Sequence, residues 1–143
     1  MKALALKIVE YAFRDKKDLA GAPYIDHLKR VADKLKNKTE HIQIVALLHD
    51  LLEDCPEWNK HVLGCFFYKE IVDAVDAITK RKNEPYNDYI NRVSSNSYAT
   101  VVKIADLQDN MDMTRLKQIT DKDVTRLKKY LAAYQFLTGE EIN

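Results

Sequence analysis

The stretch IVALLHDLLEDCPEW, residues 44–58, combines the most apolar run of the chain with an imidazole and several carboxylates. Aliphatic residues dominate its first half, and the polar groups that interrupt or follow them are His49, Asp50, Glu53 and Asp54. An unpaired ionised carboxylate in an apolar interior costs several kcal/mol, so a buried helix normally excludes acids. The stretch therefore predicts a buried helix whose C-terminal end lies where another group compensates the acidic charge.

The rest of the chain has the apolar spacing of helices. Apolar residues recur at intervals of three and four, and no segment alternates in the manner of a β-strand. The few glycines and prolines fall between these segments. We expect helices at about 3–13, 25–35, 39–54, 65–78, 86–93, 98–113 and 120–138. The third is apolar nearly all round, which is typical of the central helix of a bundle. The sequence thus predicts an all-α, single-domain helical bundle of about six to seven helices over residues 1–143.

The two ends of the last predicted helix carry clear signals. It opens with TDKD, which resembles a capping box, and Gly139 follows its last turn. Its apolar residues predict an inward face formed by Val124, Leu127, Leu131, Tyr134 and Leu137.

Composition excludes several classes of function. The chain is 46% hydrophobic and 31% charged with a formal net charge of +1, which argues against a nucleic-acid binder driven by bulk charge. No apolar run approaches the roughly 20 residues that cross a bilayer, and the N-terminal segment is typical of an amphipathic helix rather than an export signal. Neither GxGxxG nor GxxxxGK[ST] occurs, which excludes the Rossmann and P-loop nucleotide motifs. We expect a cytoplasmic protein without a nucleic-acid or membrane partner.

The polar residues of the opening stretch share helix faces. His49 and Glu53 are four residues apart, and so are Asp50 and Asp54, so each pair lies one turn apart on a common face. Acids at the C-terminal end of a helix oppose the helix dipole, so a merely solvated helix end would be an unusual reason for them.

Two polar residues interrupt apolar faces of other predicted helices. These are His27, within PYIDHLKRVADKL, and Asp106, within VVKIADLQDNMDM. If they converge on His49 and Asp50, two imidazoles and two carboxylates form a metal site in which the cation balances the buried charge. That ligand set suits Mn²⁺, Fe²⁺, Zn²⁺ or Co²⁺ better than Ca²⁺, which prefers oxygen ligands alone.

A cation with open coordination positions lowers the pKa of a bound water molecule. Glu53 and Asp54 lie one turn beyond the predicted ligands, so we expect them to orient that water or take its proton. Simpler interpretations stay open. His27 alone could be a structural residue, and the acids could form buried pairs with lysines such as Lys103.

Several segments together resemble a known family. They are GAPYIDHLKRVA (21–32), VALLHDLLEDCPEW (45–58), VDAITKR (75–81), YNDYINRV (86–93), VVKIADLQDNMDM (101–113) and RLKKYLAAYQFL (126–137). In this order the chain resembles the HD-domain metal-dependent phosphohydrolases. It is most similar to the hydrolase domain of the bifunctional Rel/SpoT alarmone enzymes and to its stand-alone bacterial relatives. The HD dipeptide alone would be a weak signal, but the ordered series of His, HD, ED, KxAD and Asn is specific.

The resemblance implies a role for eight residues. His27, His49, Asp50 and Asp106 match the four metal ligands of the family, in which Mn²⁺ is the usual ion of this branch. Glu53 and Asp54 match the acidic pair that activates or positions the attacking water. Asn110 matches an asparagine of the substrate pocket, and Lys103 occupies a position from which a lysine contacts phosphate or only supports the helix.

The resemblance also implies an enzymatic function. The expected activity is that of a metal-dependent phosphohydrolase that removes pyrophosphate from the 3′ position of guanosine tetra- or pentaphosphate. Two alternatives stay open: hydrolysis of another nucleotide, such as NADPH or a nucleoside monophosphate, and a non-catalytic metal-binding HD module. The expected partner is a small-molecule nucleotide, and the oligomeric state is open.

The sequence departs from the family pattern at positions that bear on binding of the base and phosphates. Phe13 stands near the place of a family histidine, and Asp18 and Leu19 occupy places where basic residues are common. Asp112 replaces the arginine of the family's NMR segment.

Overall fold

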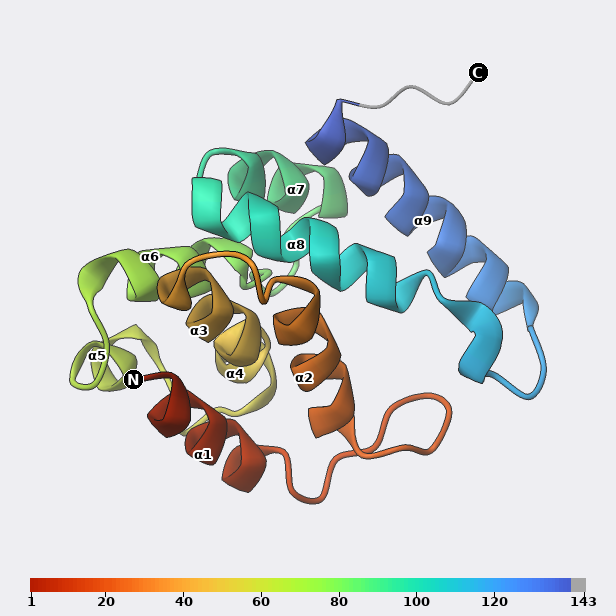
Figure 1. The fold of residues 1–143 in the computed structure, drawn as a ribbon. Coiled ribbons are helices and arrows are strands. Elements are labelled where there is room, and N and C mark those ends of the chain that lie inside the picture. Colours follow the sequence, from red (N-terminus) through yellow and green to blue (C-terminus); the bar gives the residue numbers. More distant parts are fainter. Residues whose placement is uncertain (140–143) are drawn as a thin grey trace.

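The computed structural model describes residues 1–139, and these fold into helices joined by loops (Figure 1). The helices are α1 (Lys2–Ala12), α2 (Tyr24–Lys34), α3 (Glu40–Leu48), α4 (Leu51–Asp54), α5 (Lys60–Gly64), α6 (Lys69–Ile78), α7 (Tyr86–Ser94), α8 (Ser97–Asn110), the 3₁₀ helix η1 (Met113–Arg115) and α9 (Asp121–Thr138). No strand occurs in this part of the chain, where only an isolated bridge joins Lys17 to Pro23. The predicted all-α bundle is confirmed. Residues 140–143, the end of the predicted single domain, lie outside the described residues.

Helix α3 occupies the centre of the bundle, as its composition predicts. It packs against α1, α2, α6 and α8 (Figure 1). Ile44 and Leu48 on α3, and Leu51 just after it, are fully buried. Each such side chain stabilises the fold by about 1.5–3 kcal/mol through removal of apolar surface from water. The central position of α3 brings its C-terminal end next to α2 and α8.

The predicted continuous helix over 39–54 is wrong at one point. It is interrupted at His49 and Asp50, which separate α3 from the single turn α4. The physical reason is that Nδ1 of His49 lies 2.6 Å from the carbonyl oxygen of Ala46 and takes that acceptor. A side chain inserted into the backbone ladder bends a helix. Asp50 adopts φ −101° and ψ −1°, so the chain changes direction at His49 and Asp50, the two predicted metal ligands of this segment.

Two other predicted boundaries need correction. The helix expected at 65–78 begins only at Lys69, and the preceding turn is a separate short helix, α5, which Asn59 caps by accepting a hydrogen bond from the Val62 amide at 3.0 Å. The helix expected at 98–113 ends at Asn110. Beyond it the Asp112 carboxylate accepts a hydrogen bond from the Thr114 amide at 3.0 Å and so caps η1.

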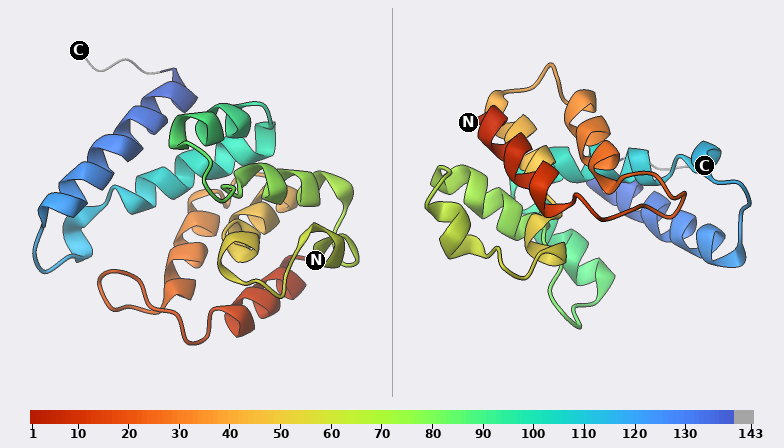
Figure 2. Two further views of the ribbon diagram at one scale, coloured as in Figure 1. Left: turned by 180° about the vertical axis from the view of Figure 1, so that it is seen from behind. Right: turned by 90° about the horizontal axis from the view of Figure 1, so that it is seen from below.

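Helix α9 begins and ends as the sequence predicts. Thr120 and Asp123 form a complete capping box, and Gly139 adopts the left-handed conformation at φ +71°. The predicted inward face is wrong in part: Val124 and Leu131 are exposed, whereas Ala133 is buried. The reason is that α9 lies on the outside of the bundle and packs on α8 and α7, so a narrower stripe is covered (Figure 2).

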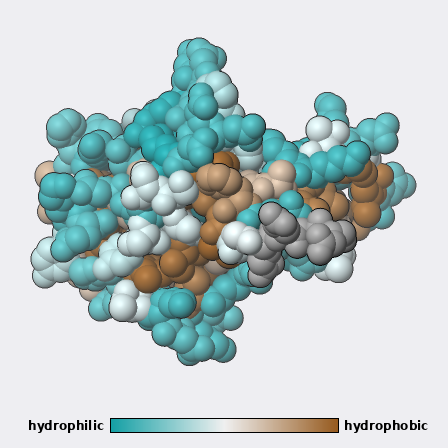
Figure 3. Space-filling view, turned by 90° about the horizontal axis from the view of Figure 1, so that it is seen from above, coloured by the Kyte–Doolittle hydropathy of each residue, from teal (hydrophilic) through white to brown (hydrophobic). Residues whose placement is uncertain are grey.

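The surface of the molecule is mixed in polarity. Hydrophilic residues cover much of the face seen from above, and hydrophobic residues reach the surface between them (Figure 3). Within residues 1–139, no helix has the length and apolar character that a membrane span requires.

Arg92 of α7 ties the C-terminal end of α6 to the loop that follows. Its guanidinium donates to the carbonyl oxygens of Ala77 at 2.8 Å and Thr79 at 2.9 Å, and pairs with the Glu84 carboxylate at 2.7 Å. The hydrogen bond from Arg92 is the main reason that the pKa of Glu84 is lowered to about 2. The planar guanidinium of Arg92 thus donates hydrogen bonds to the last carbonyl oxygens of α6 and to a carboxylate at the same time.

We predict that Arg92→Lys lowers the free energy of unfolding by about 1–3 kcal/mol, because an ammonium group cannot reproduce these hydrogen bonds. Urea unfolding followed by circular dichroism measures the change. The control is Arg14→Lys, since Arg14 is exposed and, within residues 1–139, the polar and ring contacts of its side chain are with Tyr11 and the neighbouring Asp15. Equal stability of the two variants would contradict the capping role.

Candidate metal centre

Three helices bring the four predicted metal ligands together. His27 comes from α2, His49 and Asp50 from the break after α3, and Asp106 from α8. Both imidazoles and Asp106 are buried, each less than 5% exposed. Ligand atoms of His27, His49 and Asp50 all lie within 4.8 Å of one another, a spacing that could hold a metal ion.

The fourth residue, Asp106, closes the group. Its Oδ1 lies 3.0 Å from Nε2 of His27 and 3.2 Å from Nε2 of His49. Oδ2 of Asp50 lies 3.2 Å from the same nitrogen of His49 and 3.7 Å from that of His27. Neighbouring ligand atoms of an octahedral cation, bound at about 2.1 Å, stand about 3 Å apart. The four separations between ring nitrogens and carboxylate oxygens, 3.0–3.7 Å, are close to this spacing.

Hydrogen bonds on the far side of each ring determine which nitrogen faces the cluster. Nδ1 of His27 lies 2.6 Å from Oδ2 of Asp109, and Nδ1 of His49 lies 2.6 Å from the Ala46 carbonyl oxygen. Both partners are acceptors, so each Nδ1 carries a proton and each Nε2 is left to bind a cation or a second proton. Nε2 of His27 is buried and makes no hydrogen bond within the described chain. The residues present therefore fit a divalent cation.

The neighbouring carboxylates also favour the protonated, positively charged form of the imidazoles. Burial disfavours the imidazolium form of His27, but the carboxylates of Asp106 and Asp109 outweigh it and raise its pKa to about 9. Burial likewise opposes ionisation of Asp106, and Lys103 and His49 overcome it and hold the pKa of this carboxyl well below its usual range. A proton and a metal ion therefore compete for the same negatively charged group of ligands, as they do in metal centres generally.

Asp109 is a residue of the site that the sequence analysis did not single out. It is 3% exposed, and besides His27 it accepts two hydrogen bonds from Arg30, at 2.8 and 3.1 Å. A nitrogen of the Arg115 guanidinium lies 3.5 Å from Oδ2 of Asp109. The signal in the sequence is its position three residues after Asp106, which places both on one face of α8. Asp109 and Arg30 orient the His27 ring from behind.

Tyr24 is a second residue that the sequence reasoning did not single out. Its hydroxyl donates to Oδ2 of Asp50 at 2.5 Å, and its ring stacks on that of Phe13 at 5.4 Å between centroids. Phe13, at the place of the family histidine, is buried and supports this tyrosine. Phe13, which replaces the family histidine, therefore influences the site by packing against Tyr24.

The two predicted catalytic acids face different surroundings. Glu53 lines a cavity together with Asp50 and Asp106, and burial with the nearby charges of Asp50 and Asp54 raises its pKa. Asp54 instead accepts a hydrogen bond from Lys16 at 2.8 Å, which ties α4 to the loop between α1 and α2. Of the pair, only Glu53 faces the predicted ligands across open space.

Lys103 and Asn110 both hold the carboxylate of Asp106. Nζ of Lys103 lies 2.8 Å from Oδ2, and Nδ2 of Asn110 lies 3.1 Å from Oδ1. Lys103 is buried, so it compensates the charge of Asp106, whichever other contact it makes. Both residues line the same cavity as Glu53, and Asn110 also lines a neighbouring cavity on the side of His27.

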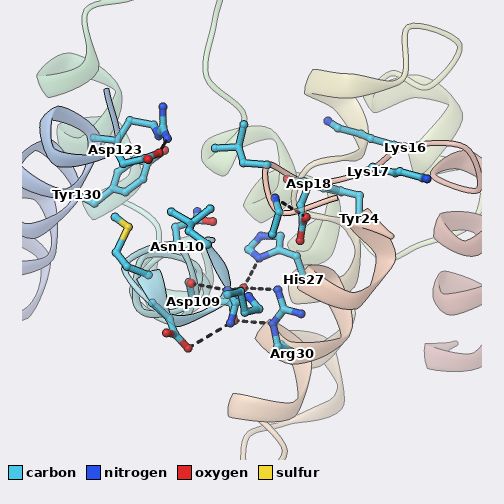
Figure 4. A pocket seen from close by; sticks show the side chains of 17 residues that line it. Lys16, Lys17, Asp18, Tyr24, His27, Arg30, Asp109, Asn110, Asp123 and Tyr130 are labelled. Atoms are coloured by element: carbon cyan, nitrogen blue, oxygen red, sulfur yellow. Dashed lines mark hydrogen bonds and ion pairs between the residues drawn. The ribbon is translucent and has the colours of Figure 1, made fainter. Parts of the chain in front are cut away.

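Two cavities of similar size adjoin the cluster and share Tyr24, Asn110 and Tyr130 in their walls. The first, of about 270 Å³, lies between the loop that carries Lys16, Lys17 and Asp18, the α2 residues His27 and Arg30, and the α9 residues Asp123 and Tyr130 (Figure 4). The second, of about 280 Å³, lies on the Glu53 side and is lined by Asp50, Glu53, Lys80, Tyr86, Tyr89, Lys103, Asp106 and Lys129. The cluster lies where the two meet.

Comparison with known proteins supports the fold. No protein-family model matches the sequence, and no curated protein matches it. Among solved structures, the chain is similar to a metazoan orthologue of SpoT described as hydrolysing ppGpp and as playing a role in starvation responses, with a TM-score of 0.79. The two are 20% identical, and the match covers 95% of this chain and 84% of that one. The fold is that of the metazoan protein. This agrees with the expected HD-domain, Rel/SpoT hydrolase-like architecture.

We predict that Asp109→Asn weakens Mn²⁺ binding by about 10- to 100-fold, because an amide holds the His27 ring less firmly than a carboxylate. Titration calorimetry of Mn²⁺ into chelator-treated protein measures the affinity. Asp88→Asn, an exposed position on α7, is the matched control and should bind as the wild type does. An Asp109→Asn variant within twofold of wild-type affinity would show that Asp109 does not position the ligand.

Proposed function

We propose that this protein is a metal-dependent phosphohydrolase of a nucleotide, and that its substrate is guanosine 3′,5′-bis(diphosphate), which it would cleave as a 3′-pyrophosphohydrolase. The observation that carries the proposal is the meeting of His27, His49, Asp50 and Asp106 beside two cavities, with the ring nitrogens 3.0–3.7 Å from the carboxylate oxygens. The similarity in fold to a protein described as hydrolysing ppGpp supports this choice of substrate.

The four residues would hold Mn²⁺, with Fe²⁺, Co²⁺ and Zn²⁺ as other ions that suit mixed nitrogen and oxygen ligands. When bound, the cation would supply Lewis acidity to a phosphate oxygen and to a water molecule. Hydrolysis adds water across the bond between the 3′ oxygen and phosphorus, so that the nucleotide keeps a 3′ hydroxyl and pyrophosphate leaves.

The chain's own residues would position the reacting groups. Glu53 would take the proton of the attacking water, a role that its raised pKa favours because a base works best when its pKa approaches the working pH. Asp54, through Lys16, would keep the loop between α1 and α2 closed against α4. Asn110 and Lys103 would hold Asp106 and face the substrate from the cavity wall.

One alternative within this class rests on the charges of the first cavity. Its arginines are each paired with a carboxylate: Arg30 with Asp109, Arg115 with Asp112 and Arg126 with Asp123. Arginines neutralised in this way favour a substrate with fewer phosphates than a bis(diphosphate) carries, so NADPH and a nucleoside monophosphate are the substrates to compare. A non-catalytic metal-binding module is the alternative from another class.

The test is a nucleotide panel with purified protein and Mn²⁺, in which release of phosphate and pyrophosphate is followed. We expect pyrophosphate from guanosine 3′,5′-bis(diphosphate), and loss of turnover in Asp106→Ala. If another nucleotide of the panel releases phosphate and guanosine 3′,5′-bis(diphosphate) releases no pyrophosphate, that other nucleotide is the substrate. Absence of turnover on every nucleotide despite bound metal would favour the binding module.

We predict that Glu53→Gln lowers kcat by about 100-fold or more while Mn²⁺ affinity changes little, because an amide cannot accept the proton. Glu57→Gln, at an exposed position after α4, is the control and should retain wild-type kcat. If Glu53→Gln loses its metal, then Glu53 is a ligand and the assigned role is wrong.

A further inference from the structure

Lys129 is a cation without an anionic partner at the edge of the second cavity. Its Nζ lies 4.7 Å from the centre of the Tyr86 ring and 5.3 Å from that of Tyr130. Within residues 1–139 no carboxylate lies within ion-pair distance of it, whereas the buried Lys103 of the same cavity is paired with Asp106. Lys129 is exposed, and the two aromatic faces attract its ammonium group while leaving its three hydrogen-bond donors free for a ligand.

Other cations face the same space. Lys80 also lines this cavity, and its only hydrogen bond in the described chain runs to the Arg81 carbonyl oxygen, at 3.4 Å. Burial and the positive charges of Lys103, Arg126 and Lys80 lower the pKa of Lys129. Asp106 offsets the charge of Lys103, so within the described residues Lys129 and Lys80 are the lysines of this cavity without a carboxylate partner, and an incoming anion can pair with them.

Tyr86 provides an unused donor in the same wall. Its hydroxyl oxygen is buried and has no hydrogen-bond partner within the described residues. The neighbouring Tyr89, by contrast, donates to the Ile78 carbonyl oxygen at 2.6 Å. A buried hydroxyl without a partner costs free energy, so at a cavity wall it donates to whatever occupies the cavity, either water or a ligand that displaces the water and accepts from it.

The first cavity differs in how its cations are paired. Its arginines are paired with carboxylates, as described above, and Asp18 accepts hydrogen bonds from the amides of Ala20 and Ala22. Lys17 of this cavity has no carboxylate partner within residues 1–139, and it belongs to the loop between α1 and α2. Lys129 and Lys80 instead share the lining of the second cavity with the predicted ligands Asp50 and Asp106. The two cavities have about the same volume, so size does not distinguish them.

We propose that the second cavity is an anion subsite that binds the departing pyrophosphate, with the Lys129 ammonium and the Tyr86 hydroxyl as donors to its oxygens. The proposal rests on the proposed function and adds the orientation of the substrate: the nucleoside occupies the first cavity, and the leaving group occupies the second. Lys129 and Tyr86 then discriminate a leaving pyrophosphate from a leaving phosphate, because the longer anion reaches both.

The experiment measures binding of inorganic pyrophosphate by titration calorimetry, at fixed saturating Mn²⁺, to wild-type protein and to Lys129→Gln and Tyr86→Phe. We expect affinity to fall about tenfold or more in Lys129→Gln, the effect of losing one charge-assisted hydrogen bond, and about threefold to tenfold in Tyr86→Phe. Lys128→Gln removes an exposed charge from the preceding position of α9, and should bind as the wild type does.

Thermal unfolding provides a second readout. Because the Tyr86 hydroxyl has no partner, Tyr86→Phe should unfold at the wild-type temperature or above it, although it binds pyrophosphate more weakly. Pyrophosphate affinity within twofold of wild type in both Lys129→Gln and Tyr86→Phe overturns the subsite. An equal loss in Lys128→Gln also overturns it, because the effect is then one of net charge.

The result separates the subsite from the proposed function. Selective loss of pyrophosphate binding in the two variants supports the subsite even in a protein that hydrolyses no nucleotide of the panel, which would count against the enzyme alone. Conversely, full hydrolysis of guanosine 3′,5′-bis(diphosphate) with unchanged pyrophosphate affinity in Lys129→Gln overturns the subsite and leaves the enzyme in place.

Discussion

The structure depends on the hydrogen bond between the His49 ring and the carbonyl oxygen of Ala46. It interrupts the central helix, places Asp50 beside His49 at the break, and leaves Nε2 of His49 directed at Asp106. The hydrogen bond of His27 to Asp109 does the same for the second imidazole. Two ring nitrogens and two carboxylates are thereby held face to face, an arrangement that needs a positive charge between them. This is why so apolar a segment tolerates acids.

The surroundings of the cluster follow from that requirement. Lys103 and Asn110 hold Asp106, and Tyr24 holds Asp50, so the carboxylates have fixed orientations. Arg30 neutralises Asp109 behind His27. Groups whose rotamers are fixed in this way provide a preorganised site, in which little ordering remains to be done when a ligand binds.

Much of this could be predicted from the sequence, because helical periodicity and the ordered series of His, Asp and Asn are local signals. The central helix, the capping box of α9 and the position of His27 on an inward face follow from spacing alone. The break at His49 could not be predicted, since it depends on a side chain competing with the backbone ladder. Asp109 was missed because its partners, His27 and Arg30, lie about 80 residues earlier in the chain. The inward face of α9 was wrong because periodicity does not reveal how much of a peripheral helix its neighbours cover.

The most direct test of the account is a crystal of the protein soaked in Mn²⁺, with anomalous diffraction used to locate the ion. The account predicts one strong peak per chain, about 2.0–2.3 Å from Nε2 of His27, Nε2 of His49, and carboxylate oxygens of Asp50 and Asp106. A peak elsewhere, or no peak among these four side chains at saturating Mn²⁺, would contradict it. The buried acids would then be structural, and no basis for metal-dependent hydrolysis would remain.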